Sequence, residues 1–81
     1  MEFEGWYAQE HARLIGSLLL ITGDLDLAAD GVDEGFARAL EHWDRVGTMG
    51  SPTGWVFKVA LNHARRVARR RGMERRLLFH P

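Results

Sequence analysis

Residues 51–71 read SPTGWVFKVALNHARRVARRR, and this stretch decides the fold because it encodes an amphipathic helix with a defined start. The Ser51 hydroxyl can accept a hydrogen bond from a free backbone N–H of the first turn, and Pro52 suits the first helical position. Gly72 interrupts the pattern. We therefore predict a helix over about residues 52–71. Its core-facing side chains are predicted to be Trp55, Val56, Val59, Ala60 and Val67.

The opposite side of this helix is strongly basic. Its polar side chains are Lys58, Asn62, Arg65, Arg66, Arg69 and Arg70. Arginine suits phosphate because its planar guanidinium donates paired, charge-assisted hydrogen bonds. Asn62 could contact a base edge or the nucleic-acid backbone. The pattern favours nucleic-acid binding, with a merely solvated basic face as the alternative. Binding to a membrane surface is disfavoured, since the core needs the apolar face of the helix.

A second helix is predicted over about residues 26–44. Its buried stripe is Val32, Phe36, Ala39, Leu40 and Trp43, at helical spacing. The other faces are largely acidic and carry Asp30, Asp33, Glu34, Arg38 and Glu41. Gly31 and Gly35 lie inside this helix, where each costs about 1 kcal/mol relative to Ala. Either close packing requires these two glycines, or the helix is weak until a partner binds it.

A first helix is predicted over about residues 3–21. Its apolar stripe is Trp6, Tyr7, Leu14, Ile15, Leu18 and Leu19. Gly23 suits a left-handed C-terminal cap, and Asp24 or Asp26 can cap the helix that follows. We find no strand-like alternation and no repeat. The prediction is one all-α domain over residues 1–81, a small bundle of three main helices, in which the tail 73–81 leaves room for a short fourth helix.

Composition narrows the classes of function. The chain has 81 residues and no cysteine, so neither a disulfide nor a thiolate metal site is available. His11, His42, His63 and His80 show no metal-ligand spacing, and no catalytic motif is present, so we expect no enzyme activity, metal or cofactor. The longest apolar run, Leu18 to Ile21, is too short to span a bilayer, and no signal peptide is evident. We therefore expect a cytoplasmic protein without a membrane partner.

Charge divides the chain into two halves. Residues 1–44 contain ten Asp or Glu and two Arg, whereas residues 45–81 contain nine Lys or Arg and one Glu, so the halves carry about −8 and +8. A basic half attracts phosphate, and an acidic half suits a basic protein surface. The asymmetry indicates two different partners, or one partner with two surfaces. The alternative is that the two halves simply attract each other.

Two stretches together resemble region 2 of the extracytoplasmic-function class of bacterial sigma factors. They are ITGDLDLAADGVDEGFARALEHWDRV, residues 21–46, and SPTGWVFKVALNHARRVARRR, residues 51–71. In that family a Thr-Gly-Asp turn is followed by an acidic helix, a loop, and a helix that opens with Pro and Trp and contains an Asn followed by several Arg. The resemblance covers roughly residues 3–72. This sequence has Ala29, Gly31 and Asp33 where the family pattern has Glu, Leu and Gln.

The resemblance implies two binding surfaces. The second helix would bind the clamp helices of the largest subunit of RNA polymerase core, through Asp30, Asp33, Glu34 and Arg38. The loop before the third helix would capture a flipped base of the promoter −10 element on the non-template strand. The loop residues are Arg45, Val46, Gly47, Thr48, Met49, Gly50 and Ser51. On the third helix, Asn62 would contact a base or the backbone, with Lys58, Arg65, Arg66, Arg69 and Arg70 on phosphates.

The resemblance therefore implies a sigma factor domain that binds polymerase and recognises and melts the −10 element. Melting by capture uses binding energy alone, since a fitted pocket offsets an unstacking cost of a few kcal/mol. Two alternatives stay open: a sigma-like interaction module that does not initiate transcription, and a non-specific nucleic-acid-binding bundle. An anti-sigma factor is a further potential partner. The family's −35-reading domain is not among these residues, so we expect one domain of a longer chain, with a naturally short sigma-like protein as the alternative.

Overall fold

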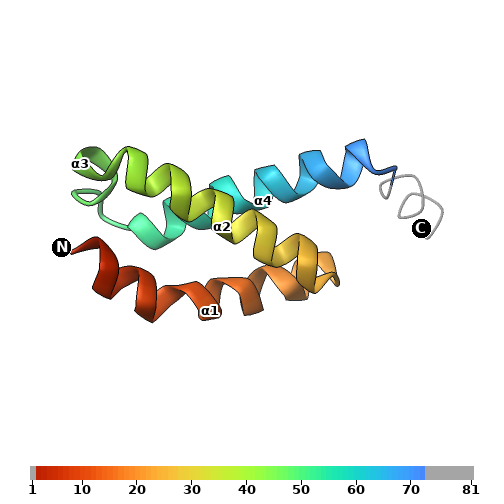
Figure 1. Ribbon diagram of the computed structural model, residues 1–81, viewed down its shortest axis with the longest axis horizontal. Coiled ribbons are helices and arrows are strands. Elements are labelled where there is room, and N and C mark those ends of the chain that lie inside the picture. Colours follow the sequence, from red (N-terminus) through yellow and green to blue (C-terminus); the bar gives the residue numbers. More distant parts are fainter. Residues whose placement is uncertain (1, 73–81) are drawn as a thin grey trace.

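The computed structural model describes residues 2–72, which form four helices and no strand within that range. The three long helices are α1 (Phe3–Thr22), α2 (Leu25–Glu41) and α4 (Pro52–Arg70), and a single turn, α3 (Trp43–Val46), lies between α2 and α4 (Figure 1). The all-α prediction with three main helices is confirmed. The predicted short helix in the tail falls on residues 73–81, outside the described residues.

The turn between α1 and α2 has the predicted capping residues. Gly23 adopts a left-handed conformation with φ 68°, and its N–H donates to the carbonyl of Leu19 at 2.8 Å. Asp24, rather than Asp26, is the N-cap of α2, and its Oδ1 accepts from the Leu27 N–H at 3.0 Å. These two neighbouring residues end one helix and begin the next, so the chain reverses direction over a very short connection.

The second helix is shorter than predicted, because it ends at Glu41 and not at residue 44. His42 has non-helical angles, φ −117° and ψ 31°, and the chain then forms α3. The break has a packing reason. It brings Trp43 against Trp6, with ring centroids 4.9 Å apart, and buries Val46 completely. A continuous helix would carry these two apolar side chains past the end of the bundle.

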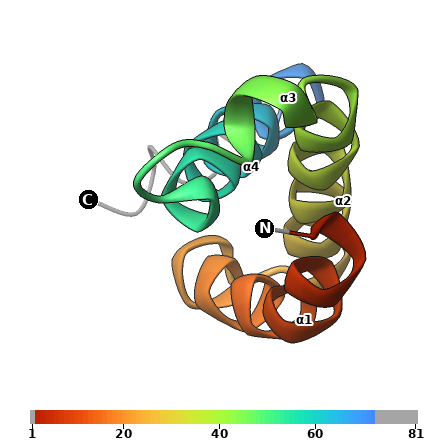
Figure 2. The same ribbon diagram turned by 90° about the vertical axis from the view of Figure 1, so that its left-hand side faces the viewer.

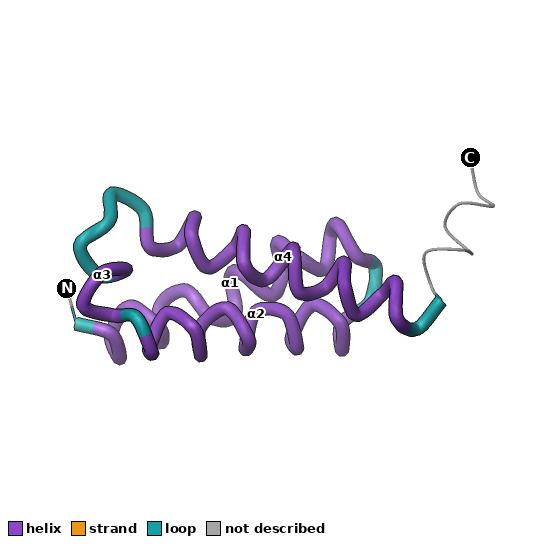
Figure 3. The backbone as a smooth tube through the Cα atoms, turned by 90° about the horizontal axis from the view of Figure 1, so that it is seen from above, coloured by secondary structure: helices purple, strands orange, loops and turns teal. Residues whose placement is uncertain are grey.

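Helix α4 begins as predicted and ends one residue earlier. Ser51 is its N-cap, with Oγ accepting from the Gly54 N–H at 3.0 Å, and Pro52 follows in the first turn. The helix ends at Arg70, and Gly72 then adopts φ 76°. The loop that joins α3 to α4 lies at the same end of the molecule as the N-terminus (Figure 3).

Helix α2 packs against both α1 and α4 and makes its most extensive contact with α4, so that the three long helices surround a common core (Figure 2). The two interior glycines of α2 make the α2–α4 contact close. A Cβ atom on Gly31 would lie 2.8 Å from the carbonyl oxygen of Ala60, and one on Gly35 would lie 2.8 Å from that of Val56. Close packing therefore explains both glycines.

Most predicted core positions are buried or half-buried, and two are exposed. The buried apolar side chains are Trp6, Leu14, Leu18, Leu27, Ala28, Val32, Phe36, Ala39, Val46, Val56, Ala60, Ala64 and Val67. Leu40 and Tyr7 were predicted to be buried, but they are 58% and 37% exposed. Both line a groove between α1 and α2. Leu27, Ala28, Val46 and Ala64 are core residues that the apolar stripes had not included.

Candidate functional site

The acidic face of α2 is defined here by the four predicted residues Asp30, Asp33, Glu34 and Arg38. The side chains of Asp30 and Asp33 are 56% and 62% exposed. Glu34 and Arg38 lie one turn apart and form an ion pair of 2.7 Å between Oε2 and Nε. Because this pair is largely solvated, it contributes only about 0.3–0.5 kcal/mol to stability. The face therefore presents carboxylates to solvent, and the Glu34–Arg38 pair adds little to the stability of the fold.

Two histidines hold the carboxylates of this face from neighbouring helices. His11 on α1 places Nε2 2.7 Å from Oδ1 of Asp33, and His63 on α4 places Nε2 2.9 Å from Oδ2 of Asp30. A protonated ring nitrogen donates to the carboxylate in each pair. The acidic face is thus tied to both helices that flank α2. Sequence reasoning missed these pairs, since their members lie 22 and 33 residues apart.

The basic face of α4 carries the six predicted side chains Lys58, Asn62, Arg65, Arg66, Arg69 and Arg70, and all six are exposed. Lys58, Asn62, Arg65 and Arg69 follow each other at helical spacing along one stripe, opposite the buried Val56, Ala60 and Val67.

Four of these cations lack an internal partner. Lys58, Arg65, Arg66 and Arg70 form no ion pair or hydrogen bond through their side chains within residues 2–72. Attraction between the acidic and basic halves of the chain therefore does not account for them. They present positive charge to solvent along a rigid helix, which is an arrangement suited to phosphate groups.

The predicted loop, residues 45–51, is partly helical and partly packed. Arg45 and Val46 belong to α3, and Val46 is fully buried, so its side chain is not available to a ligand. Met49 packs against the core. The Thr48 hydroxyl donates to the carbonyl of Arg45 at 2.8 Å and closes a tight turn. Arg45, Thr48, Gly50 and Ser51 are exposed, and they form the surface that this segment offers.

A buried tryptophan anchors this segment to α1. The indole Nε1 of Trp6 donates to Oγ1 of Thr53 at 2.9 Å, and Trp6 is only 6% exposed. Thr53 lies in the first turn of α4, directly after the loop. Trp6 also stacks on Trp43 of the short helix before the loop. Both ends of the loop are therefore held by the same side chain, a contact that the helical spacing of Trp6 alone did not reveal.

Within residues 2–72, no group of three His, Asp or Glu side chains lies close enough to hold a metal ion. No helix in the same range combines the length and the apolar character needed to cross a bilayer.

Comparison with known proteins then identifies the family. The family model described as Sigma-70 region 2 matches residues 6–74. The chain belongs to the Sigma-70 region 2 family. This family is a domain of sigma factors, which are transcription-initiation factors and not enzymes. The match includes the acidic face of α2, the loop and the basic face of α4.

One relative among curated proteins is an uncharacterized protein of Rhizobium meliloti (strain 1021), 35% identical over 62 residues. The aligned segment covers 76% of this chain and 15% of that protein. This chain therefore spans a small part of the relative's length. No solved structure gave a significant match.

Proposed function

We propose that this Sigma-70 region 2 domain binds RNA polymerase core through the acidic face of α2, and binds the −10 element through α4 and the loop before it. We further propose that it belongs to the extracytoplasmic-function class and acts in the cytoplasm. The proposal rests on two features that occur together in this domain. Asp30 and Asp33 present exposed carboxylates on α2. Helix α4 presents Asn62 and four cations that have no side-chain partner within residues 2–72, namely Lys58, Arg65, Arg66 and Arg70. Exposed carboxylates suit a basic surface on the polymerase, and exposed cations suit the phosphates of promoter DNA.

On the nucleic-acid side, the proposed roles follow from chemistry and position. Lys58, Arg65, Arg66, Arg69 and Arg70 bind phosphates, and these contacts fix the register of the helix without reading sequence. Asn62 lies on the same stripe as Lys58 and Arg65, so its amide reaches the nucleic acid when these side chains do. An amide can pair with an adenine edge, and it therefore supplies sequence preference.

The loop completes the proposed nucleic-acid surface. Its exposed residues Arg45, Thr48, Gly50 and Ser51 adjoin the N-terminus of α4, and Trp6 holds both flanks of the segment in place. A rigid loop can accept an unstacked base without an ordering cost of its own. Capture of a base from the non-template strand would then offset the few kcal/mol that unstacking costs, and the strands separate.

On the protein side, the carboxylates of Asp30, Asp33 and Glu34 are proposed to pair with basic side chains on the polymerase clamp helices. His11 and His63 hold two of these carboxylates in fixed orientations, which lowers the entropy lost on binding. Because Asp30 and Asp33 are exposed and Glu34 is half-buried, a partner can reach these carboxylates without unfolding any part of the domain.

DNA selectivity tests this proposal. The domain is mixed with core polymerase, and the complex is titrated with two fluorescent single-stranded oligonucleotides of equal length, one with a −10-like sequence and one with the same bases scrambled. The proposal predicts tighter binding of the −10-like strand, with both affinities falling as salt rises. Equal affinity for the two strands would contradict the proposed recognition of the −10 element and would indicate a non-specific nucleic-acid-binding domain.

A further inference from the structure

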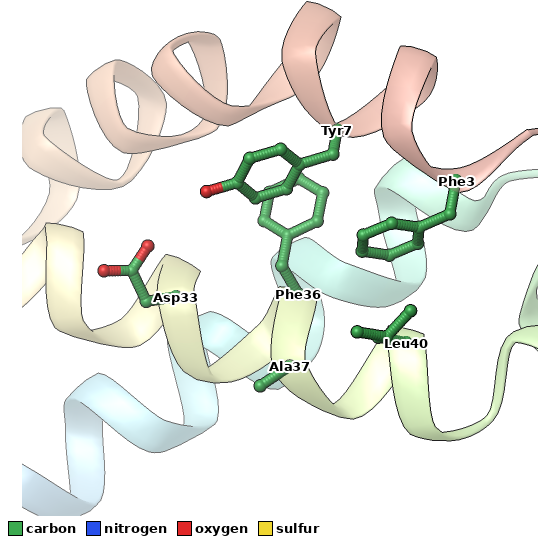
Figure 4. Close-up of a pocket in the computed structure, with 6 residues that line it drawn as sticks. All are labelled: Phe3, Tyr7, Asp33, Phe36, Ala37 and Leu40. Atoms are coloured by element: carbon green, nitrogen blue, oxygen red, sulfur yellow. The ribbon is translucent and has the colours of Figure 1, made fainter.

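A groove with a volume of about 410 Å³ lies between the N-terminal part of α1 and the C-terminal part of α2. Phe3 and Tyr7 of α1 form one wall, and Asp33, Phe36, Ala37 and Leu40 of α2 form the other (Figure 4). The groove contains the two side chains, Tyr7 and Leu40, that the apolar stripes had assigned to the core. It is therefore a largely apolar site that the rest of residues 2–72 leaves uncovered.

The aromatic wall of the groove is preformed. The ring of Tyr7 meets that of Phe36 edge to face at 4.9 Å between centroids, and Phe3 stacks on Tyr7 at 5.9 Å. Phe36 is 2% exposed and anchors the wall in the core. Since these rings fix each other, a ligand entering the groove meets a surface that needs no rearrangement.

The carboxylate of Asp33 places a negative charge on the rim of the groove. Asp33 is 62% exposed, and His11 contacts its Oδ1 at 2.7 Å. Its Oδ2 has no hydrogen-bond partner within residues 2–72, so it can accept from an incoming cation. Residues 1–44, which include all of α1 and α2, carry about −8, and this excess disfavours phosphate-bearing ligands in the groove.

We propose that the groove is an anchor pocket for an apolar side chain on a protein partner, whose neighbouring Arg or Lys pairs with Asp33. Asp33 belongs to both the groove and the acidic face of α2. The inference therefore rests on the proposed function, and the occupant is a segment of RNA polymerase core. The negative charge of Asp33 favours a basic segment of the partner. The exposed Leu40 and Tyr7 favour an apolar residue within that segment. Interface hot spots lie in well-packed, desolvated pockets and are enriched in Trp, Tyr and Arg, so a side chain seated in this groove beside an Arg would be a hot spot.

Filling the groove tests the proposal. Ala37 is exposed and lines the groove, so Ala37→Phe places a ring in it without disturbing the core. Ala12→Phe is the matched control, because Ala12 is also exposed and helical but does not line the groove. Affinity for core polymerase is measured by fluorescence anisotropy at several protein concentrations. We expect Ala37→Phe to weaken binding about tenfold or more, as for a lost hot spot, and Ala12→Phe to leave it unchanged.

Leu40→Ser is a second variant, and it keeps the test valid if the added ring perturbs folding. It removes an exposed apolar side chain of the groove, and it is expected to weaken polymerase binding while the melting temperature stays at the wild-type value. Unchanged affinity in both groove variants, with binding lost in Glu34→Arg, would overturn the anchor pocket and leave the proposed function intact. If the wild-type domain self-associates, and Ala37→Phe abolishes this self-association but keeps its polymerase affinity, the groove binds a second copy of the chain. That result would overturn the proposal. A wild-type domain that does not bind core would overturn both.

Discussion

Gly31 on α2 lies directly against the backbone of Ala60 on α4, so closely that an added Cβ atom would come within 2.8 Å of the Ala60 carbonyl oxygen. The same Cβ would lie 3.2 Å from a methyl group of Leu18, which is fully buried. All three helices therefore meet at this glycine. Helix α2 can approach α4 only because no side chain intervenes at this point.

This contact predicts the effect of Gly31→Ala. Helix propensity alone would favour alanine by about 1 kcal/mol. The new methyl group would press on a backbone carbonyl, which cannot move as a flexible side chain does, and overpacking of this kind costs about 1–3 kcal/mol. We expect a net loss of up to about 2 kcal/mol in the free energy of unfolding, measured by urea denaturation.

Gly16→Ala is the matched control for that substitution. Gly16 is an exposed glycine inside α1, and a Cβ there would have no neighbour within 4 Å. Propensity should then act alone, so we expect Gly16→Ala to stabilise the domain by up to about 1 kcal/mol. A Gly31→Ala variant that is also stabilised would show that the α2–α4 contact is looser than described.

The hydrogen bond between Trp6 and Thr53 predicts a second stability effect. Thr53→Val keeps the shape of the side chain but leaves the buried indole N–H of Trp6 without an acceptor. An unsatisfied buried donor costs about 1–3 kcal/mol. Thr48→Val also removes a hydroxyl that forms a hydrogen bond, but that bond is exposed and local. Thermal unfolding should therefore show a clearly larger decrease in Tm for Thr53→Val. Equal decreases would mean that the indole finds water instead.

Asn62 and Arg66 are predicted to differ in their effects on DNA binding. Asn62→Ala should reduce the preference of the polymerase complex for the −10-like strand over the scrambled strand, by about 1–3 kcal/mol if the amide reads a base edge. Arg66→Ala should weaken binding to both strands about equally and lower the slope of affinity against salt concentration. Equal losses on the two strands in Asn62→Ala would remove its proposed reading role.

Reversing one charge on the acidic face should separate binding from folding. Glu34→Arg places two cations one turn apart on α2 and costs only a few tenths of a kcal/mol in stability, because the Glu34–Arg38 pair is exposed. We expect circular dichroism to show a folded domain and polymerase binding to be lost. Asp44→Arg, the same charge change at an exposed position on α3, should bind normally. If Glu34→Arg binds as tightly as wild type, the interface lies elsewhere.

The sequence predicted the features that depend on neighbouring residues. Gly23, Asp24 and Ser51 act as helix caps in the predicted way, because capping involves only residues within one turn. The exposed placement of Lys58, Asn62 and Arg65 followed from helical periodicity, since a single amphipathic helix fixes which side faces the core.

Features that depend on how helices meet were not predictable in the same way. Leu40 is exposed in the groove between α1 and α2, and the end of α2 at Glu41 depends on the packing of Trp43 and Val46. The His11–Asp33 and His63–Asp30 pairs join residues on different helices. The periodicity of one helix carries no information about contacts between helices. The histidine–aspartate pairs and the groove could therefore be found only from the structure.

Competition for core RNA polymerase tests the central claim most directly. Labelled sigma factor is bound to core enzyme, and the unlabelled domain is titrated in while anisotropy is recorded. We predict that the wild-type domain displaces the sigma factor and that folded Glu34→Arg does not. A folded wild-type domain that leaves the sigma factor bound at saturating concentration would contradict it.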